Sequence, residues 1–173
     1  MEAEKKFLLK EGNQIFATFD VSYFPDSVGD WKLIETTDIQ QGYLDCDFAR
    51  VWARDYCRVD VLFSIKDARV RKQGRKLTLA FKSDGGLKRH KVEIPIDESV
   101  FDLLWKLSEG RRVIKTRYIY FDGKYEIKIN AYKNLPLIVA EVEFLNDKEA
   151  ESFVPIGKDV TEDPKYKNRN LIA

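Results

Sequence analysis

Alternation of charged and apolar residues at every second position is the feature that most constrains the fold of this chain. Near the N-terminus, Glu2, Glu4 and Lys6 share one parity. Phe7 and Leu9 share the other. Because successive side chains of a strand point to opposite faces, this stretch predicts a β-strand with one ionic face and one largely apolar face.

The same alternation recurs along the chain, and each recurrence predicts a further strand. Asp122-Gly123 is the strongest hairpin turn between them, and Gln73-Gly74-Arg75 and Gly85-Gly86 are further turns. Short turns of this kind predict antiparallel pairing. The predicted strands lie at 2–9, 15–21 (short or irregular), within 31–43, and at 59–65, 69–71, 77–82, 89–96, 113–121, 125–130 and 137–144.

One helix is predicted between the strands. Asp97 is the expected N-cap, residues 100–107 carry an apolar stripe at helical spacing, and Gly110 ends the helix. A short helix is expected after Asn146, and a last helical turn near Pro164. A mainly β, α+β fold with a few covering helices follows.

Length and composition indicate one domain spanning residues 1–173. No apolar run approaches the roughly 20 residues that would cross a bilayer, and the charged N-terminus has no signal-peptide core, so a cytoplasmic location without membrane attachment is expected. Cys46 and Cys57 are expected to be reduced structural thiols. His90 lies between basic residues and is expected to be solvated.

The ionic parity collects nine basic and six acidic residues, and two interpretations fit them. They could form a solvated outer face with weak cross-strand ion pairs. Alternatively, the strands could close into a barrel whose lumen holds a polyanion and a divalent cation. The residues are Glu2, Glu4, Lys6, Arg69, Arg71, Lys82, Arg89, Lys91, Glu93, Lys115, Arg117, Glu126, Lys128, Glu141 and Glu143.

A family resemblance favours the second interpretation. The opening Glu2-Ala3-Glu4-Lys5-Lys6 is similar to the Glu-x-Glu-x-Lys signature of the CYTH domains, or triphosphate tunnel metalloenzymes. The resemblance covers essentially the whole chain, in order. It continues through Gln41-Gly42-Tyr43-Leu44, Arg69-Val70-Arg71, Leu77-Thr78 to Lys82, Arg89, Glu93, Lys115-Thr116-Arg117-Tyr118, Glu126, Ala140-Glu141-Val142-Glu143, and Val160-Thr161 to Asn170-Leu171.

The resemblance implies a closed, eight-stranded antiparallel barrel that hydrolyses a triphosphate with Mg²⁺ or Mn²⁺. Inorganic tripolyphosphate is the expected substrate, and a nucleoside triphosphate is an alternative. The implied phosphate-binding residues are Lys6, Arg69, Arg71, Lys82, Arg89, Lys115 and Arg117, with Lys91 and Lys128 added. The implied metal-side residues are Glu2, Glu4, Glu93, Glu126, Glu141 and Glu143, and the implied catalytic residues are Glu2, Glu4, Lys6, Glu141 and Glu143.

Two lysines depart from the family pattern. Lys91 and Lys128 stand where the pattern has acids, in Arg-x-Glu-x-Glu and Glu-x-Asp respectively. Either the remaining glutamates hold a catalytic metal while the lysines contact phosphate, or the lysines form salt bridges in place of a metal. In the second case the tunnel is a nucleotide or triphosphate receptor without turnover.

A third departure is the long stretch from Asp45 to Asp67. Its Trp52, Tyr56 and Phe63 are expected to extend the outer core, with a base-stacking surface as the alternative. The family also contains class IV adenylyl cyclases, which gives a further alternative activity. A nucleic-acid partner is not expected, because basic residues alternate with carboxylates. A monomer or a homodimer fits the sequence.

Overall fold

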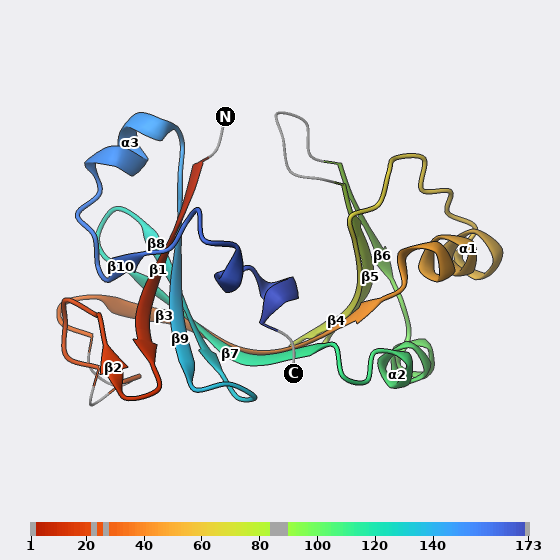
Figure 1. Ribbon diagram of the computed structural model, residues 1–173, viewed down its shortest axis with the longest axis horizontal. Helices are drawn as coiled ribbons and strands as arrows, with labels where there is room; N and C mark the ends of the chain where they lie inside the picture. Colours follow the sequence, from red (N-terminus) through yellow and green to blue (C-terminus); the bar gives the residue numbers. More distant parts are fainter. Residues whose placement is uncertain (1–2, 22–23, 26–27, 84–89, 172–173) are drawn as a thin grey trace. The chain divides into compact units, whose positions relative to one another are not determined.

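A computed structural model describes residues 3–21, 24–25, 28–83 and 90–171 (Figure 1). Within these residues there are eight strands of five residues or more and two of two residues. The strands are β1 (Ala3–Glu11), β2 (Gln14–Ile15), β3 (Lys32–Leu44), β4 (Asp67–Gln73), β5 (Lys76–Lys82), β6 (Lys91–Pro95), β7 (Arg112–Phe121), β8 (Glu126–Tyr132), β9 (Leu137–Phe144) and β10 (Lys158–Asp159). The helices are α1 (Cys46–Cys57), α2 (Glu98–Leu107) and α3 (Asp147–Ser152), followed by the 3₁₀ turns η1 (Pro164–Tyr166) and η2 (Asn168–Asn170).

The chain forms two compact units. Among the described residues, unit 1 consists of those up to Asp38 and of Lys115–Leu171, and unit 2 of those from Ile39 to Ile114. Strands β3 and β7 each contribute residues to both units. The expectation of one domain over residues 1–173 stays a prediction.

Unit 1 is built on the strand order β10-β1-β9-β8-β7-β3, with β2 paired to β1. Its apolar core includes Phe7, Ile129 and Val142, which are fully buried. These residues share the parity opposite to the ionic residues, as the alternation predicts. Phe153, directly after α3, packs on the same core and lies 5.8 Å from the Phe7 ring, centroid to centroid.

Unit 2 is built on the order β3-β4-β5-β6. Helices α1 and α2 lie on the same side of these strands (Figure 1). Val70, Leu79 and Phe81 form the strand side of this core, and Ala53 and Leu104 come from the helices. The ionic parity of β4 and β5 therefore faces away from both helices.

Most predicted elements are confirmed. The Asp97 side chain accepts from the Val100 amide at 2.8 Å and caps α2. Asn146 caps α3 in the same way. The Asp122-Gly123 hairpin joins β7 to β8, with Gly123 at φ 104° and the Asp122 carboxylate accepting from two amides of the turn. The predicted turn at Gly85-Gly86 lies outside the described residues.

The predicted strand at 59–65 is wrong. This segment follows α1 as irregular backbone, and its carbonyls at Val61 and Phe63 accept hydrogen bonds from the Arg50 guanidinium. Because one arginine on the helix satisfies these carbonyls, the segment needs no strand partner there. Trp52 and Phe63 pack on the unit 2 core as expected, whereas Tyr56 is largely exposed.

Each of these pairs of neighbouring strands is antiparallel: β1–β10, β1–β9, β3–β4, β4–β5, β5–β6, β7–β8 and β8–β9. A mainly β, α+β fold is thus confirmed, and closure into a barrel stays a prediction. Cys46 and Cys57 are free thiols. Among the helices of the described residues, none has the length and apolar character needed to cross a membrane.

Candidate functional site: an ionic sheet face in each unit

The ionic face of unit 1 is formed by neighbouring strands in fixed register. Glu141 on β9 lies opposite Lys6 on β1 and opposite Lys128 on β8. On the next row, Glu4 lies opposite Glu143. Alternation thus brings together residues that are more than a hundred positions apart in sequence.

Glu141 is the most densely paired carboxylate of this face. It lies 4.0 Å from Lys6 Nζ and 3.7 Å from Arg117 Nη2, and its side chain is only 13% exposed. Burial raises the pKa of such a carboxyl, but Lys115, Lys6 and Arg117 outweigh it and hold the pKa of Glu141 below its ordinary value. Glu141 therefore stays ionised at neutral pH.

Lys115 and Asn130 belong to the same face, and both are fully buried. The Lys115 ammonium lies 5.5 Å from the centre of the Tyr132 ring. Arg117 Nε donates to Asn130 Oδ1 at 2.9 Å, and Asn130 Nδ2 donates to Glu141 at 3.3 Å. A neutral amide therefore holds the guanidinium and the carboxylate in place.

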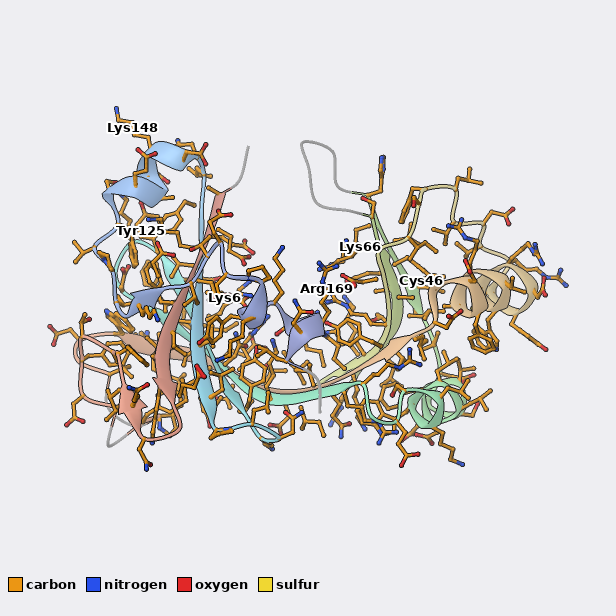
Figure 2. The ribbon with its side chains drawn as sticks, in the orientation of Figure 1. Lys6, Cys46, Lys66, Tyr125, Lys148 and Arg169 are labelled. Carbon is orange, nitrogen blue, oxygen red and sulfur yellow. The ribbon has the colours of Figure 1, made fainter. Side chains whose placement is uncertain are left out.

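The C-terminal turns η1 and η2 contact the same face (Figure 2). Lys6 Nζ donates to the Tyr166 carbonyl at 3.0 Å. The Tyr132 hydroxyl donates to Asn168 Oδ1 at 2.6 Å. The C-terminal segment therefore positions one predicted phosphate-binding lysine.

An acidic cluster borders the same face, and we define it as Glu4, Glu141 and Glu143. Desolvation and the charge of Glu141 raise the pKa of Glu4, while Lys6 opposes the rise. Lys128 Nζ lies 3.7 Å from Glu143 Oε1. Carboxylates on adjacent strands with an unfavourable mutual charge are a donor set that suits Mg²⁺ or Mn²⁺. In the part of the chain that the structure describes, no group of three or more His, Cys, Asp or Glu is already arranged as a metal site.

Unit 2 has its own ionic face. Tyr43, Arg69, Ala80 and Glu93 form one row across β3 to β6. Arg69 is 7% exposed, and its Nε is buried with no hydrogen-bond partner among the described residues. A buried guanidinium nitrogen without an acceptor is a position at which a phosphate oxygen fits.

In the neighbouring row, Arg71 stands between two uncharged residues. Gln41, Arg71 and Thr78 lie side by side, and Gln41 Nε2 donates to the Tyr43 hydroxyl at 2.8 Å. Burial raises the pKa of Tyr43, although the positive charge of Arg69 opposes the rise. The tyrosine is therefore a neutral hydroxyl at physiological pH.

Glu93 is engaged by lysines. Its Oε1 lies 2.8 Å from Lys91 Nζ and its Oε2 lies 3.7 Å from Lys76 Nζ. The hydrogen bond from Lys91 holds the pKa of Glu93 below its usual range, against a small effect of burial. Lys82 and Lys91 are cross-strand neighbours at the end of the same strands.

The predicted site residues thus divide between the two units. Glu4, Lys6, Lys115, Arg117, Glu126, Lys128, Glu141 and Glu143 lie in unit 1. Arg69, Arg71, Lys82, Lys91 and Glu93 lie in unit 2, and Glu2 and Arg89 lie outside the described residues. Glu126 is exposed at the first position of β8, opposite Phe121.

Sequence reasoning did not select the uncharged members of these faces. Gln41, Tyr43, Asn130 and Tyr132 all share the ionic parity, but a selection by charge passes over them. The parity itself was the signal that would have found them.

Comparison with known proteins places the chain in a family. No protein-family model matches it. An inorganic triphosphatase of Nitrosomonas europaea is 35% identical over 176 residues, which cover 98% of this chain and 95% of that protein. The chain belongs to the CYTH family. The family resemblance of the sequence is therefore confirmed.

Solved structures agree with CYTH membership. The crystal structure of an inorganic triphosphatase matches with a TM-score of 0.65 and 32% identity, covering 99% of this chain and 93% of that one. A protein from Pyrococcus horikoshii matches with a TM-score of 0.50 and 20% identity, covering 87% of this chain and 84% of that one. The second match concerns the fold alone.

Proposed function

We propose that this CYTH protein is a metal-dependent triphosphatase that hydrolyses a phosphoanhydride bond, with inorganic tripolyphosphate as the substrate. The observation that carries the proposal is the similarity, over nearly the full length of both chains, to an inorganic triphosphatase. In the reaction, a water oxygen forms a bond to the terminal phosphorus as the bridging P–O bond breaks. Orthophosphate and pyrophosphate leave, and the water proton passes to solvent or to a carboxylate.

The basic residues bind and neutralise the phosphates in this proposal. Phosphoryl transfer spreads negative charge over the transferring group, so fixed cations lower its barrier. The buried Nε of Arg69 and the buried ammonium of Lys115 support this assignment, because both are groups to which an anion is a suitable neighbour. The proposed phosphate-binding residues are Lys6, Arg69, Arg71, Lys82, Arg89, Lys91, Lys115, Arg117 and Lys128.

The acidic residues hold the metal. Glu4, Glu141 and Glu143 are the best supported, because Glu4 and Glu143 are cross-strand partners with Glu141 on the adjacent row, and desolvation and the charges of Glu141 and Glu143 raise the pKa of Glu4. Bound Mg²⁺ or Mn²⁺ would supply Lewis-acid stabilisation of phosphoryl oxygens and orientation of the water. Glu2, Glu93 and Glu126 complete the proposed metal side, and Lys6 acts with Glu2, Glu4, Glu141 and Glu143 in catalysis.

Closure of the eight longer strands into a tunnel belongs to the same proposal and is supported by CYTH membership. The proposal also includes a single domain over residues 1–173, a cytoplasmic location, and action as a monomer or homodimer on a small-molecule triphosphate.

A second candidate function is a receptor that binds a triphosphate or nucleotide without turnover. Two ion pairs favour it, namely Lys91 with Glu93 at 2.8 Å and Lys128 with Glu143 at 3.7 Å. Each lysine occupies a carboxylate that the triphosphatase needs for its metal. The receptor predicts tight anion binding with little dependence on metal.

The deciding experiment measures orthophosphate release from tripolyphosphate and from ATP, each with Mg²⁺, with Mn²⁺ or with neither. It compares the native chain with Glu141→Ala and with Glu151→Ala, an exposed glutamate of α3 that serves as the matched control. A triphosphatase releases orthophosphate only with metal, and loses this activity in Glu141→Ala alone.

Other outcomes identify the alternatives. If no condition gives turnover while tripolyphosphate raises the melting temperature without metal, the protein is a receptor. If ATP yields cyclic nucleotide and pyrophosphate in place of orthophosphate, it is a cyclase of the class IV type.

A further inference from the structure

Lys128 lies among the carboxylates of the acidic cluster. Its cross-strand neighbour on β9 is Glu141, and its Nζ lies 3.7 Å from Glu143 Oε1. Glu4 stands opposite Glu143 on the far side of β9. The Lys128 side chain is 27% exposed, so its charge is only partly screened by water.

The other ion pairs between this face and the acidic cluster are made through Glu141. Lys6 is shared between Glu141, at 4.0 Å, and the Tyr166 carbonyl, at 3.0 Å. Arg117 is held by Asn130 and Glu141. Lys128 is therefore the basic side chain that pairs with Glu143 among the described residues.

The charge of Lys128 also acts on the rest of the cluster. Lys128 is the cross-strand neighbour of Glu141 as well as the ion-pair partner of Glu143, so it lies beside two of the three carboxylates. The three carboxylates already attract cations that are attached to the chain, and Lys128 is the one that contacts Glu143. A divalent ion that binds there meets a positive charge that cannot diffuse away.

We propose that Lys128 is a tethered cation that competes with the divalent ion for the acidic cluster and thereby sets the metal concentration the site requires. The inference rests on the proposed function, because a metal at this cluster is part of that proposal. It concerns the protein before any phosphate compound binds, and so adds to the phosphate contact that the proposed function gives to Lys128.

Metal binding in the absence of any phosphate compound tests the inference. The probe is Mn²⁺ alone, titrated into the full chain at low ionic strength and followed by the electron paramagnetic resonance signal of the free ion. Lys128→Met removes the charge and keeps the side-chain length, and Lys128→Gln is a second uncharged variant. Lys128→Arg keeps the charge. Lys133→Met is the matched control. Lys133 is an exposed lysine directly after β8, and among the described residues its ion pair is with exposed Asp38, at 3.4 Å.

Lys128→Met and Lys128→Gln are expected to bind Mn²⁺ at least tenfold more tightly than the native chain, a change of about 1.4 kcal/mol. Lys128→Arg and Lys133→Met are expected to stay within about twofold of it. Equal or weaker binding in both uncharged variants, or no binding by any chain, overturns the inference. So does a tenfold gain in Lys133→Met, since the effect is then not local.

Phosphate release separates this inference from the proposed function. If the function holds, Lys128→Met reaches half-maximal release at a lower metal concentration. Should the native chain release no phosphate while Lys128→Met still binds Mn²⁺ more tightly, the tethered-cation inference stands and the triphosphatase proposal fails. If the native chain releases phosphate but both uncharged variants bind Mn²⁺ no more tightly than it does, the triphosphatase proposal stands and the tethered-cation inference fails.

Discussion

The side-chain amide of Asn130 donates to Glu141 across the β8–β9 pairing, over 3.3 Å, while its oxygen accepts from Arg117 Nε at 2.9 Å. One neutral side chain thus separates and orients a carboxylate and a guanidinium on the unit 1 ionic face. Asn130 is fully buried, so both of its polar ends depend on these partners.

Replacing Asn130 by leucine keeps the branching of the side chain and removes both hydrogen bonds. Hydrogen bonds to charged groups contribute about 1.5–3 kcal/mol each. Because Arg117 and Glu141 partly neutralise each other once the amide is gone, we expect the free energy of unfolding to fall by about 2–4 kcal/mol. Urea denaturation monitored by fluorescence measures it. A loss below about 0.5 kcal/mol would show that Arg117 and Glu141 pair equally well without the amide.

Glu141→Gln should destabilise the protein in a pH-dependent way. The cations Lys115, Lys6 and Arg117 hold the pKa of Glu141 below its ordinary value of 4.5, despite burial. A lowered carboxyl pKa contributes stability above the unfolded pKa, and this contribution is lost as pH falls below about 4.5. We expect a loss of about 1.5–3 kcal/mol at pH 7 that shrinks in acid. Denaturation at pH 7 and at pH 3 checks it, and an equal loss at both contradicts it.

Glu4→Gln should have the opposite sign. Desolvation and the charge of Glu141 raise the pKa of Glu4, so its ionised form is disfavoured in the folded state. Stability from a raised carboxyl pKa is present at low pH and is lost as pH rises through the folded value. Removing the charge is therefore expected to raise the melting temperature at pH 7 and to leave it unchanged at pH 3. A lower melting temperature at pH 7 would mean that Lys6 and Lys128 outweigh the repulsion.

The strands and the ionic faces were predictable because alternation at every second residue is a local signal. The register between strands then places the charged residues of neighbouring strands side by side on one face. Lys6, Glu141 and Lys128 share one parity in sequence and one row in the sheet. The uncharged Asn130 and Tyr43 have the same parity and lie on the same faces, but a selection by charge passes over them.

Helix α1 was not predicted, and its composition explains why. Its core-facing Cys46, Ala49, Ala53 and Cys57 recur at helical spacing, but they are small, while the larger Phe48 and Val51 are exposed, so large hydrophobic residues do not mark the buried face. The hydrophobic residues of the following segment resemble a strand, and only the tertiary contact from Arg50 determines its irregular path.

Arg50→Lys tests that contact. The guanidinium reaches the carbonyls of Val61 and Phe63 with two different nitrogens, and a lysine ammonium cannot reproduce this planar fork. We expect a loss of about 1–3 kcal/mol in the free energy of unfolding. Arg54→Lys, at an exposed position of the same helix, is the control and should change it by less than about 0.5 kcal/mol.

Gly42→Ala should disrupt the packing of β3 on α2 in unit 2. A Cβ at residue 42 would lie 2.2 Å from Ser108 Oγ and 2.5 Å from Ser108 Cβ, closer than real Cβ contacts. Ser108 is fully buried, and its hydroxyl donates to the Trp105 carbonyl at 2.7 Å, so it cannot turn away without cost. Overpacking of this kind costs typically about 1–3 kcal/mol, and thermal denaturation should show it.

A double substitution tests whether Ser108 is the cause. Ser108→Gly removes both atoms that the new methyl would meet and leaves the nearest Trp105 carbon at 3.3 Å. In the Ser108→Gly background, Gly42→Ala should therefore cost less than half of what it costs in the native chain. An undiminished cost would locate the clash elsewhere, because the coupling between two residues in contact disappears when one of them is removed.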